Sequence, residues 1–237
     1  MKIGVISDIH GNLRALEVIL RAFQLHSVER IICIGDMIGY FHQSIDVLDR
    51  LMKINVECLF GNHEAYLLGH LKCSRENWQI YFLDQVKKNI SRKRLNWLSK
   101  LPESLEINLN DKYLSFFHGS PWKPLEEYIY PDSNKFDDFA TLRWEWIFLG
   151  HTHYPMLKHI GNVNIINPGS CGLPRDGDLR ASAAIFDSDK EKIFFIKESY
   201  DIQLTIKEAL LAGVSSDVIQ KFKDKHLLLI HNNNPKV

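Results

Sequence analysis

Apolar runs and amphipathic segments alternate along the first sixty residues. Residues 2–7, 31–34 and 56–60 are largely apolar runs of strand length, whereas residues 13–23 and 45–52 carry apolar side chains at helical spacing. Short apolar runs separated by amphipathic helices are typical of strands buried in a parallel sheet. The order strand, helix, strand, helix, strand therefore predicts an α/β fold.

The remainder of the chain adds further helices and strands. Helical patterns cover 70–101, a short stretch around 135–142, and 202–226, which we expect to split into two helices near Gly213. Strands are predicted at 105–109 and 113–117 as a hairpin around Asn110, and at 146–149, 163–166, 181–187 and 192–197. We expect a frayed end at 231–235. No repeat or low-complexity linker interrupts the chain, so we predict one domain over 1–237, with the helices of about 202–226 packed on it.

Polar residues follow five of the predicted strands directly. In chain order they are Asp8, His10, Asp36, Asn62, His118, His151 and His153. In wound α/β sheets the ends of the strands form the edge where ligands bind. Taken singly, each Asp or Asn is explained equally well as a turn residue and each His as a structural one. Seven such residues at five strand ends predict a common site.

The segment Gly150-His151-Thr152-His153 is central to this prediction. It follows the apolar run 146–149, and its two histidines are one residue apart. Alternate side chains of an extended backbone point the same way. We therefore expect the two imidazoles to project together, with Gly150 allowing the backbone to bend.

The donor types indicate a metal centre. Imidazole and carboxylate together suit manganese, iron, zinc or nickel better than magnesium or calcium alone. Seven ligands exceed what one such ion needs, but they suit two ions ~3.5–4 Å apart that share a carboxylate. Two divalent cations, two aspartates and a bridging hydroxide leave a charge of roughly +1, which attracts phosphate. We expect two divalent cations, manganese first, with Fe, Zn, Ni or Mg as alternatives.

Composition excludes several other classes of partner. Lys plus Arg equals Asp plus Glu at 29 each, so no overall charge favours bulk nucleic-acid binding or an anionic membrane. No apolar run approaches the ~20 residues that span a bilayer, and the first residues lack the pattern of a signal peptide. The four cysteines are scattered, which favours a reducing compartment. We expect a cytoplasmic protein without a membrane partner, and the sequence leaves the oligomeric state open.

The ordered motifs resemble those of the calcineurin-like metallophosphoesterases. The matching motifs are Asp8-x-His10, Gly35-Asp36-x-x-Gly39, Gly61-Asn62-His63-Glu64, His118-Gly119 and Gly150-His151-x-His153. The sequence is most similar to the small bacterial and archaeal branch described as phosphodiesterase-like or diadenosine-tetraphosphatase-like. That similarity continues through 118–121, 167–170 and 174–178. It implies two mixed β-sheets packed as a sandwich and flanked by helices in four layers, with a dinuclear site at one edge.

The resemblance also implies roles for individual residues. One ion would be held by Asp8, His10, Asp36 and His153, and the other by Asp36, Asn62, His118 and His151, with Asp36 bridging. His63 matches no ligand position, so we assign it to protonating the leaving oxygen or stabilising developing charge. Asn62 and His63 would also contact the substrate. Glu64 is expected to favour the N-terminus of the helix that follows.

One departure from the family pattern concerns the residues after Asp36. In the protein Ser/Thr phosphatases of this superfamily, an Asp that orients the catalytic His and an Arg that clamps the phosphoryl group follow. Gly39 and Tyr40 occupy those places here. The missing bidentate clamp argues against specialised hydrolysis of protein monoesters, and it leaves open which group orients His63.

Three arginines are candidates to replace the missing cation. They are Arg143, Arg175 and Arg180. Arg175 is favoured for substrate binding because it follows the glycine-rich turn after the 163–166 strand. A structural salt bridge is an equally good explanation for each of the three.

The sequence thus predicts a hydrolase of P–O bonds, in which a metal-bridging hydroxide attacks phosphorus. A phosphodiester or nucleotide-type substrate is favoured, with dinucleoside polyphosphates or phosphomonoesters as alternatives. A non-catalytic scaffold of the same fold is the alternative from another class, and missing metal ligands would indicate it; all seven are present. Trp122, Tyr128 and Tyr130 could stack a nucleobase, but we expect them to seal their loop against the domain.

Overall fold

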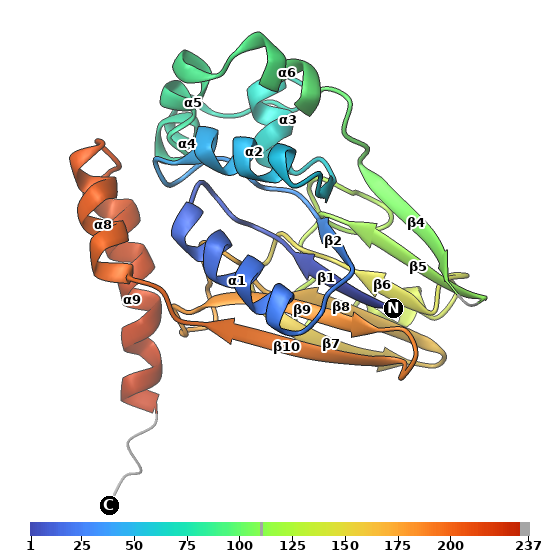
Figure 1. The fold of residues 1–237 in the computed structure, drawn as a ribbon. Coiled ribbons are helices and arrows are strands. Elements are labelled where there is room, and N and C mark those ends of the chain that lie inside the picture. The colour runs from blue at the N-terminus through green and yellow to red at the C-terminus, as the bar shows by residue number, and fades with distance from the viewer. Residues whose placement is uncertain (110, 233–237) are drawn as a thin grey trace, which may run out of the picture.

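In a computed structural model the strands form two mixed five-stranded sheets, as predicted (Figure 1). The structure describes residues 1–109 and 111–232, with side chains through residue 224. The first sheet has the order β10-β9-β1-β2-β3, and the second has the order β4-β5-β6-β8-β7. Asn110, the centre of the predicted hairpin turn, lies outside the described residues.

Each sheet combines three strands that pair in parallel with two strands that are joined by antiparallel pairing. In the first sheet the parallel strands are β1 (Lys2–Ile6), β2 (Arg30–Cys33) and β3 (Glu57–Cys58), and the antiparallel strands are β9 (Ala181–Asp187) and β10 (Lys192–Glu198). In the second they are β5 (Lys112–Phe117), β6 (Trp146–Phe148) and β8 (Val163–Pro168), flanked by antiparallel β4 (Ser104–Leu109) and β7 (Pro155–Ile160). The sequence pattern did not reveal β7, because it is a half-exposed edge strand in which polar residues interrupt the apolar ones.

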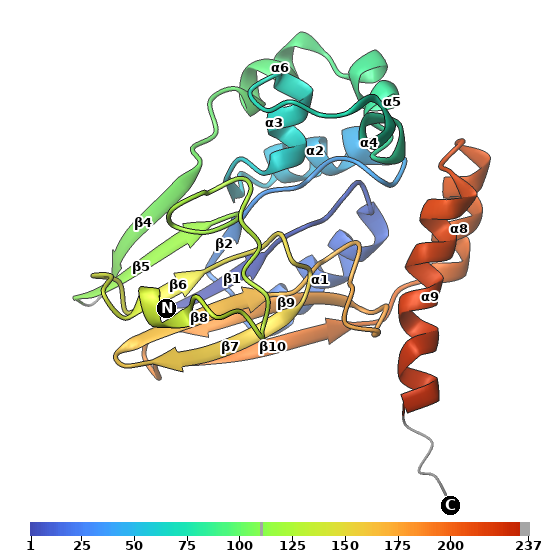
Figure 2. The same ribbon diagram turned by 180° about the vertical axis from the view of Figure 1, so that it is seen from behind.

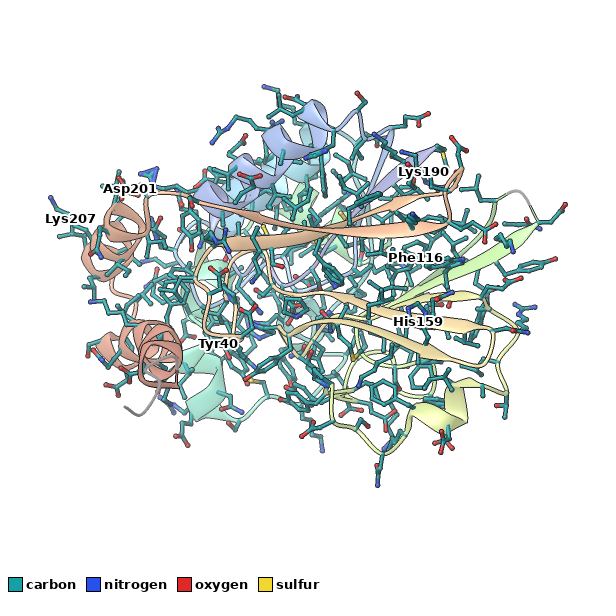
Figure 3. All side chains as sticks on the ribbon, turned by 90° about the horizontal axis from the view of Figure 1, so that it is seen from below. Tyr40, Phe116, His159, Lys190, Asp201 and Lys207 are labelled. Atoms are coloured by element: carbon teal, nitrogen blue, oxygen red, sulfur yellow. The ribbon has the colours of Figure 1, made fainter. Side chains whose placement is uncertain are left out.

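The two sheets pack face to face through a buried apolar layer. Ile3 and Val5 of β1 lie in this layer because side chains two residues apart share one face of a strand. Phe116 of β5, labelled in Figure 3, stacks on Phe148 of β6 with ring centroids 4.7 Å apart. Both phenylalanines are completely buried, so this layer holds the two sheets in fixed relation.

Helices α1 (Leu13–Leu25) and α2 (Ser44–Lys53) cover the outer face of the first sheet. Asn12 caps α1 as predicted, because its side chain accepts a hydrogen bond from the backbone N–H of Ala15. The remaining N-terminal helices are α3 (Asn62–Leu68), α4 (Arg75–Ile80), α5 (Leu83–Asn89) and α6 (Arg92–Leu98). The helical pattern over 70–101 is thus broken into three short helices, because Phe82 adopts a left-handed backbone and Ser91 caps a new helix.

A helical hairpin stands beside the two sheets in both ribbon views (Figures 1 and 2). It comprises α8 (Ile202–Leu211) and α9 (Ser216–Asn232), separated near Gly213 as predicted. Val218 and Phe222 of α9 pack in one cluster with Phe41 and Leu173. The predicted fraying at 231 and 232 is wrong because α9 continues through 232, and residues 233–235 lie outside the described part.

The short helix α7 (Phe136–Phe139) packs against the outer face of the second sheet. None of the helices within the described residues has both the length and the apolar character needed to cross a bilayer.

The loops after the parallel strands meet at one edge of the sandwich. Backbone hydrogen bonds join the loops that follow different strands. The N–H of His10 donates to the carbonyl of Asp36 at 3.0 Å, and the N–H of Gly150 donates to the carbonyl of His118 at 2.8 Å. The N–H of His151 also donates to Oδ2 of Asp8 at 3.1 Å, which connects the two sheets. The polar clusters of both sheets are thereby brought together.

Candidate metal centre

One half of the polar cluster contains Asp8, His10 and His153. The Nε2 atoms of the two histidines are 3.2 Å apart, and Nε2 of His153 lies 3.2 Å from Oδ1 of Asp8. On the far side of each ring, Nδ1 donates to a backbone carbonyl, of Ile38 at 3.2 Å and of Leu173 at 2.6 Å. Because a carbonyl only accepts, the proton is on Nδ1 and the Nε2 lone pair faces the centre.

The other half contains Asn62, His118 and His151. Nε2 of His118 lies 2.9 Å from Oδ1 of Asn62 and 3.1 Å from Nδ1 of His151. Its Nδ1 donates to the carbonyl of Ile34 at 3.0 Å, so this ring is oriented in the same way as those of the first half. The ring of Tyr128 stacks on His151 with centroids 3.7 Å apart.

Asp36 lies between the two halves. Its Oδ2 is 3.7 Å from Nε2 of His10 and 3.4 Å from Nε2 of His118. Its Oδ1 accepts a hydrogen bond from the backbone N–H of His63 at 2.9 Å. Nε2 of His63 lies 3.8 Å from Oδ2. The carboxylate is thus placed to be shared by ligand groups on both sides.

These residues fit a metal centre on three observations. Potential ligand atoms lie within 4.8 Å of one another in three groups: Asp8, His10 and His153; His10, Asp36 and His63; Asp36, His118 and His151. Oδ1 of Asp8 is buried without a hydrogen-bond partner among the described residues. Such polar atoms are costly to bury unless something else satisfies them. The mixture of carboxylate, imidazole and amide oxygen suits first-row divalent ions.

The electrostatics of the cluster also favour a cation. Burial lowers the pKa of His63 to about 4 and that of His151 to about 3, so both are in the neutral form that binds metals. Burial also lowers the pKa of His118, but the carboxylates of Asp36 and Asp8 outweigh it and raise that pKa to about 10. The two buried carboxylates thus favour positive charge at this position.

Several predicted ligands have an unusual backbone. Five of the seven have positive φ: Asp8, His10, Asp36, His151 and His153, between 50° and 65°. Such left-handed conformations cost a non-glycine residue ~1–2 kcal/mol. They persist here because hydrogen bonds between the loops hold the backbone, a pattern common at functional sites.

The same observation corrects the prediction for residues 150–153. This segment is a left-handed turn and not an extended strand, so His151 faces His118 whereas His153 faces Asp8. Gly150 is needed for space and not for a bend. A Cβ atom there would lie 2.2 Å from Oγ of Ser7.

Glu64 has a larger role than the helix-end preference predicted for it. One oxygen accepts from the N–H of Gly61 at 2.9 Å and of Asp36 at 3.0 Å, and the other accepts from Met37 at 2.9 Å and Ile38 at 3.2 Å. The carboxylate therefore ties the loop that carries Asp36 to the start of α3. Its completely buried position, which sequence reasoning did not foresee, makes this possible.

Asn167 is a second supporting residue that sequence reasoning left without a role. Its side-chain NH₂ donates to the carbonyl of Gly150 at 2.7 Å and to Oγ1 of Thr152 at 3.0 Å. These bonds hold the turn that carries both histidines. The available signal was its place at the end of a predicted strand, which it shares with the candidate ligands.

Aromatic rings surround His63 and answer the question of what orients it. The ring centroids of Tyr81 and Tyr40 lie 4.3 Å and 5.3 Å from that of His63. Nδ1 of His63 is buried without a hydrogen-bond partner among the described residues. A Cβ on Gly39 would lie only 2.3 Å from this nitrogen. The packing of the tyrosine rings therefore holds the His63 ring. The backbone at Gly39 leaves no space beside Nδ1 for a carboxylate such as the one that orients the catalytic histidine in the protein phosphatases.

The three candidate arginines have different environments. Arg143 pairs with Glu106, and Arg180 pairs with Asp178, so the structural explanation holds for these two. The Arg175 guanidinium has no hydrogen bond or ion pair with any described residue. Its positive charge opposes the burial that raises the pKa of Tyr40 and Tyr128, which places it close to the cluster.

The aromatic residues of the loop after His118 also separate into two kinds. Trp122 packs edge-on against Phe139 at 4.8 Å and seals the loop, as expected. Tyr128 instead lies on His151, and Tyr130 stacks on Tyr128 with centroids 5.8 Å apart. These two rings also pack against the domain, as expected, and Tyr128 does so on a candidate metal ligand.

Comparisons with known proteins agree with this geometry. Residues 1–191 match the model of the calcineurin-like phosphoesterase superfamily domain. An uncharacterized protein of Methanocaldococcus jannaschii is 34% identical over 220 residues, covering 85% of this chain and 88% of that protein. A phosphodiesterase of the same organism is 24% identical over 184 residues, covering 76% and 92%.

Solved structures show the same architecture. The crystal structure of a metallophosphoesterase from Sphaerobacter thermophilus superposes with a TM-score of 0.78 at 29% identity, covering 94% of this chain and 98% of that one. A hypothetical protein from Pyrococcus horikoshii superposes with a TM-score of 0.82 at 20% identity, covering 93% and 97%. The chain therefore belongs to the calcineurin-like phosphoesterase superfamily and is a metallophosphoesterase.

Proposed function

We propose that this metallophosphoesterase hydrolyses phosphodiester or nucleotide-type substrates at a centre of two divalent cations, with manganese as the first expectation. The observation that carries the proposal is the position of Asp36, whose Oδ2 lies 3.7 Å from Nε2 of His10 and 3.4 Å from Nε2 of His118. A single carboxylate thus reaches both groups of ligands. When bound, two such cations lower the pKa of water and neutralise charge on the phosphoryl oxygens.

The chain's own residues divide into two ligand sets. Asp8, His10, Asp36 and His153 would hold one cation, and Asp36, Asn62, His118 and His151 would hold the other. The backbone carbonyls that bind Nδ1 of His10, His118 and His153 fix the ring orientations before a cation arrives. This preorganisation supports a centre that binds metal without rearrangement of the loops.

His63 acts on the substrate in this proposal. Its backbone N–H is bound by Asp36, and its ring is held by Tyr40 and Tyr81. The ring protonates the leaving oxygen, or stabilises by an N–H hydrogen bond the negative charge that develops on it, as the P–O bond breaks. The geometry also permits His63 as a ligand, because it shares a group with His10 and Asp36. Metal content distinguishes the two roles.

We favour a diester over a monoester because few positively charged side chains are available to bind the phosphoryl group. A monoester dianion needs more positive charge than a diester monoanion, and Tyr40 occupies the place of the phosphatase clamp. Arg175 is the candidate arginine that remains without an ion pair among the described residues. We assign to it the binding of a phosphoryl oxygen. The presence of the complete ligand set argues against the scaffold alternative.

The proposal is tested by metal content and turnover of the full chain. We expect two Mn²⁺ ions per chain by elemental analysis and Mn²⁺-stimulated hydrolysis of bis(p-nitrophenyl) phosphate that exceeds hydrolysis of p-nitrophenyl phosphate. Asp36→Asn should lower both metal content and turnover. His159→Ala is the matched control, because His159 is an exposed histidine on β7 outside the cluster (Figure 3). Binding of one ion, or none, would refute the dinuclear centre.

The role of His63 is tested with two leaving groups. His63→Ala should keep its metal and lose ~10²–10⁴-fold in kcat on a dinucleotide, whose alkoxide leaving group needs a proton. The loss on bis(p-nitrophenyl) phosphate should be much smaller, because p-nitrophenolate leaves without protonation. Loss of one ion per chain would instead identify His63 as a ligand. Equal losses on both substrates would indicate charge stabilisation and not proton donation.

A further inference from the structure

A pocket of about 430 Å³ lies between α9 and the loops of the candidate metal centre. Tyr40, Tyr130 and Tyr154 contribute aromatic walls. Arg175 and Lys221 contribute positive charge, and Asp224 contributes one negative charge. Leu173, Val218 and Phe222 add apolar surface. Ligand pockets commonly span ~300–1,000 Å³. This volume suits a single nucleotide unit and not a long polymer.

The pocket adjoins the metal centre through shared residues. The ring of Tyr40 contacts those of His10 and His63 at 4.9 Å and 5.3 Å. The Leu173 carbonyl accepts from Nδ1 of His153. Only the side chain of Tyr40 therefore separates a group bound in this part of the pocket from His10, one of the residues that would hold the cations.

The character of the walls indicates the kind of ligand. Tyr130 and Tyr154 meet edge to face with centroids 5.9 Å apart, and both rings border the pocket. Aromatic rings beside a cation are the usual means of binding a base and its phosphate. Arg175 carries no ion pair with a described residue, so its charge is available to a ligand. Lys221 is exposed on α9, where the described residues give it no ion pair either.

We propose that this pocket binds the nucleoside that stays attached to phosphorus, with its base against Tyr130 and Tyr154. Arg175 contacts the phosphoryl group, and Lys221 attracts the anionic substrate. This proposal rests on the proposed function and names the substrate class as nucleoside phosphodiesters.

The C-terminal hairpin supplies one wall of this pocket. Phe222 meets Phe41 edge to face at 5.5 Å, which anchors α9 next to Tyr40. Figure 3 shows Tyr40 beside this helix. The superfamily model matches only residues 1–191, so the wall lies outside the matched region. The residues proposed to contact the base and the phosphoryl group, Tyr130, Tyr154 and Arg175, lie within the matched region.

A matched pair of substrates tests the proposal. Thymidine 5′-p-nitrophenyl phosphate and methyl p-nitrophenyl phosphate release the same leaving group and differ only in the retained group. The Mn²⁺-loaded full chain should prefer the thymidine substrate in kcat/KM by at least tenfold. Tyr130→Ala should reduce that preference at least about fivefold through lost stacking, whereas Tyr130→Phe should retain it. Lys207→Glu, on the outer side of α8 (Figure 3), should leave kcat/KM for both substrates unchanged, whereas Lys221→Glu should lower kcat/KM for both, because the two diesters carry the same negative charge.

Calorimetric binding gives a second readout that does not depend on turnover. Thymidine 5′-monophosphate should bind at least about fivefold more tightly than deoxyribose 5-phosphate, and Tyr130→Ala should remove the difference. Equal affinity for the two ligands, or absence of binding to both metal-free and Mn²⁺-loaded protein, overturns the pocket assignment. Efficient hydrolysis of both diesters without a preference for thymidine also overturns the pocket assignment, but it leaves the proposed function intact. Nucleotide binding without any metal-stimulated turnover supports the pocket and overturns the proposed function.

Discussion

Gly39→Ala is a sharp test of how His63 is positioned. A Cβ at residue 39 would lie 2.3 Å from Nδ1 of His63, although Cβ atoms essentially never approach a heavy atom within 3.0 Å. The ring must therefore move by at least 0.7 Å, the difference between these two distances. It cannot move freely, because it is 3% exposed and packed against Tyr81 and Tyr40.

The magnitude follows from two separate effects. Gly39 has φ of 95°, so an alanine there costs ~1–2 kcal/mol in backbone strain. That strain lowers the free energy of unfolding without altering the chemistry. Displacing a catalytic group by ~1 Å costs ~10²-fold in rate, which corresponds to ~2.7 kcal/mol. We therefore expect kcat on a dinucleotide to fall about 10²-fold while the protein stays folded.

Gly213→Ala is the matched control for this experiment. Gly213 has φ of 91°, but nothing lies within 4 Å of the Cβ position. Both variants should lose stability in urea unfolding through backbone strain, with a larger loss for Gly39→Ala because its Cβ also displaces a packed ring, and Gly39→Ala alone should lose turnover. In the double variant Gly39→Ala/His63→Ala, kcat should equal that of His63→Ala alone, because the two changes act through one side chain.

Two results would refute this reasoning. If Gly39→Ala keeps kcat within threefold of Gly213→Ala, the close approach to His63 does not position it. If the loss from Gly39→Ala adds in full to that from His63→Ala, the glycine acts through some other group. Metal content measured on every variant excludes loss of cations as the cause of a low rate.

Three further predictions concern the metal centre and the core. Glu64→Gln should lower the free energy of unfolding by about 2–4 kcal/mol in urea and weaken Mn²⁺ binding at least tenfold, because an amide leaves two of the four N–H donors unsatisfied. Mn²⁺ at about 100 times its Kd should raise Tm by about 5–10 °C in calorimetry, and an equal rise in Asp36→Asn would contradict the assigned site. Phe116→Ala should cost about 3–5 kcal/mol of unfolding free energy, because its ring is completely buried on Phe148; a loss below 1 kcal/mol would contradict the description of the layer between the sheets.

The regular elements were largely predictable from local patterns. Apolar runs identified the strands that carry the site, and Asn12 marked the first helix as a capping residue should. The antiparallel pair near the C-terminus and the helix break near Gly213 were also predicted correctly. The sequence pattern did not predict β7, because the outward side chains of this edge strand mix polar and apolar types. It predicted one helical stretch over 70–101, where the structure has the three short helices α4, α5 and α6.

The sequence by itself determined that candidate metal ligands follow successive strands, and parallel strands deliver their loops to one edge. Only the tertiary structure decided how those residues face one another. His151 and His153 turn to different halves of the cluster because their backbone is left-handed, which spacing along the chain does not encode. The fit of Gly39 against His63 and the place of α9 beside Tyr40 likewise depend on contacts between segments far apart in sequence.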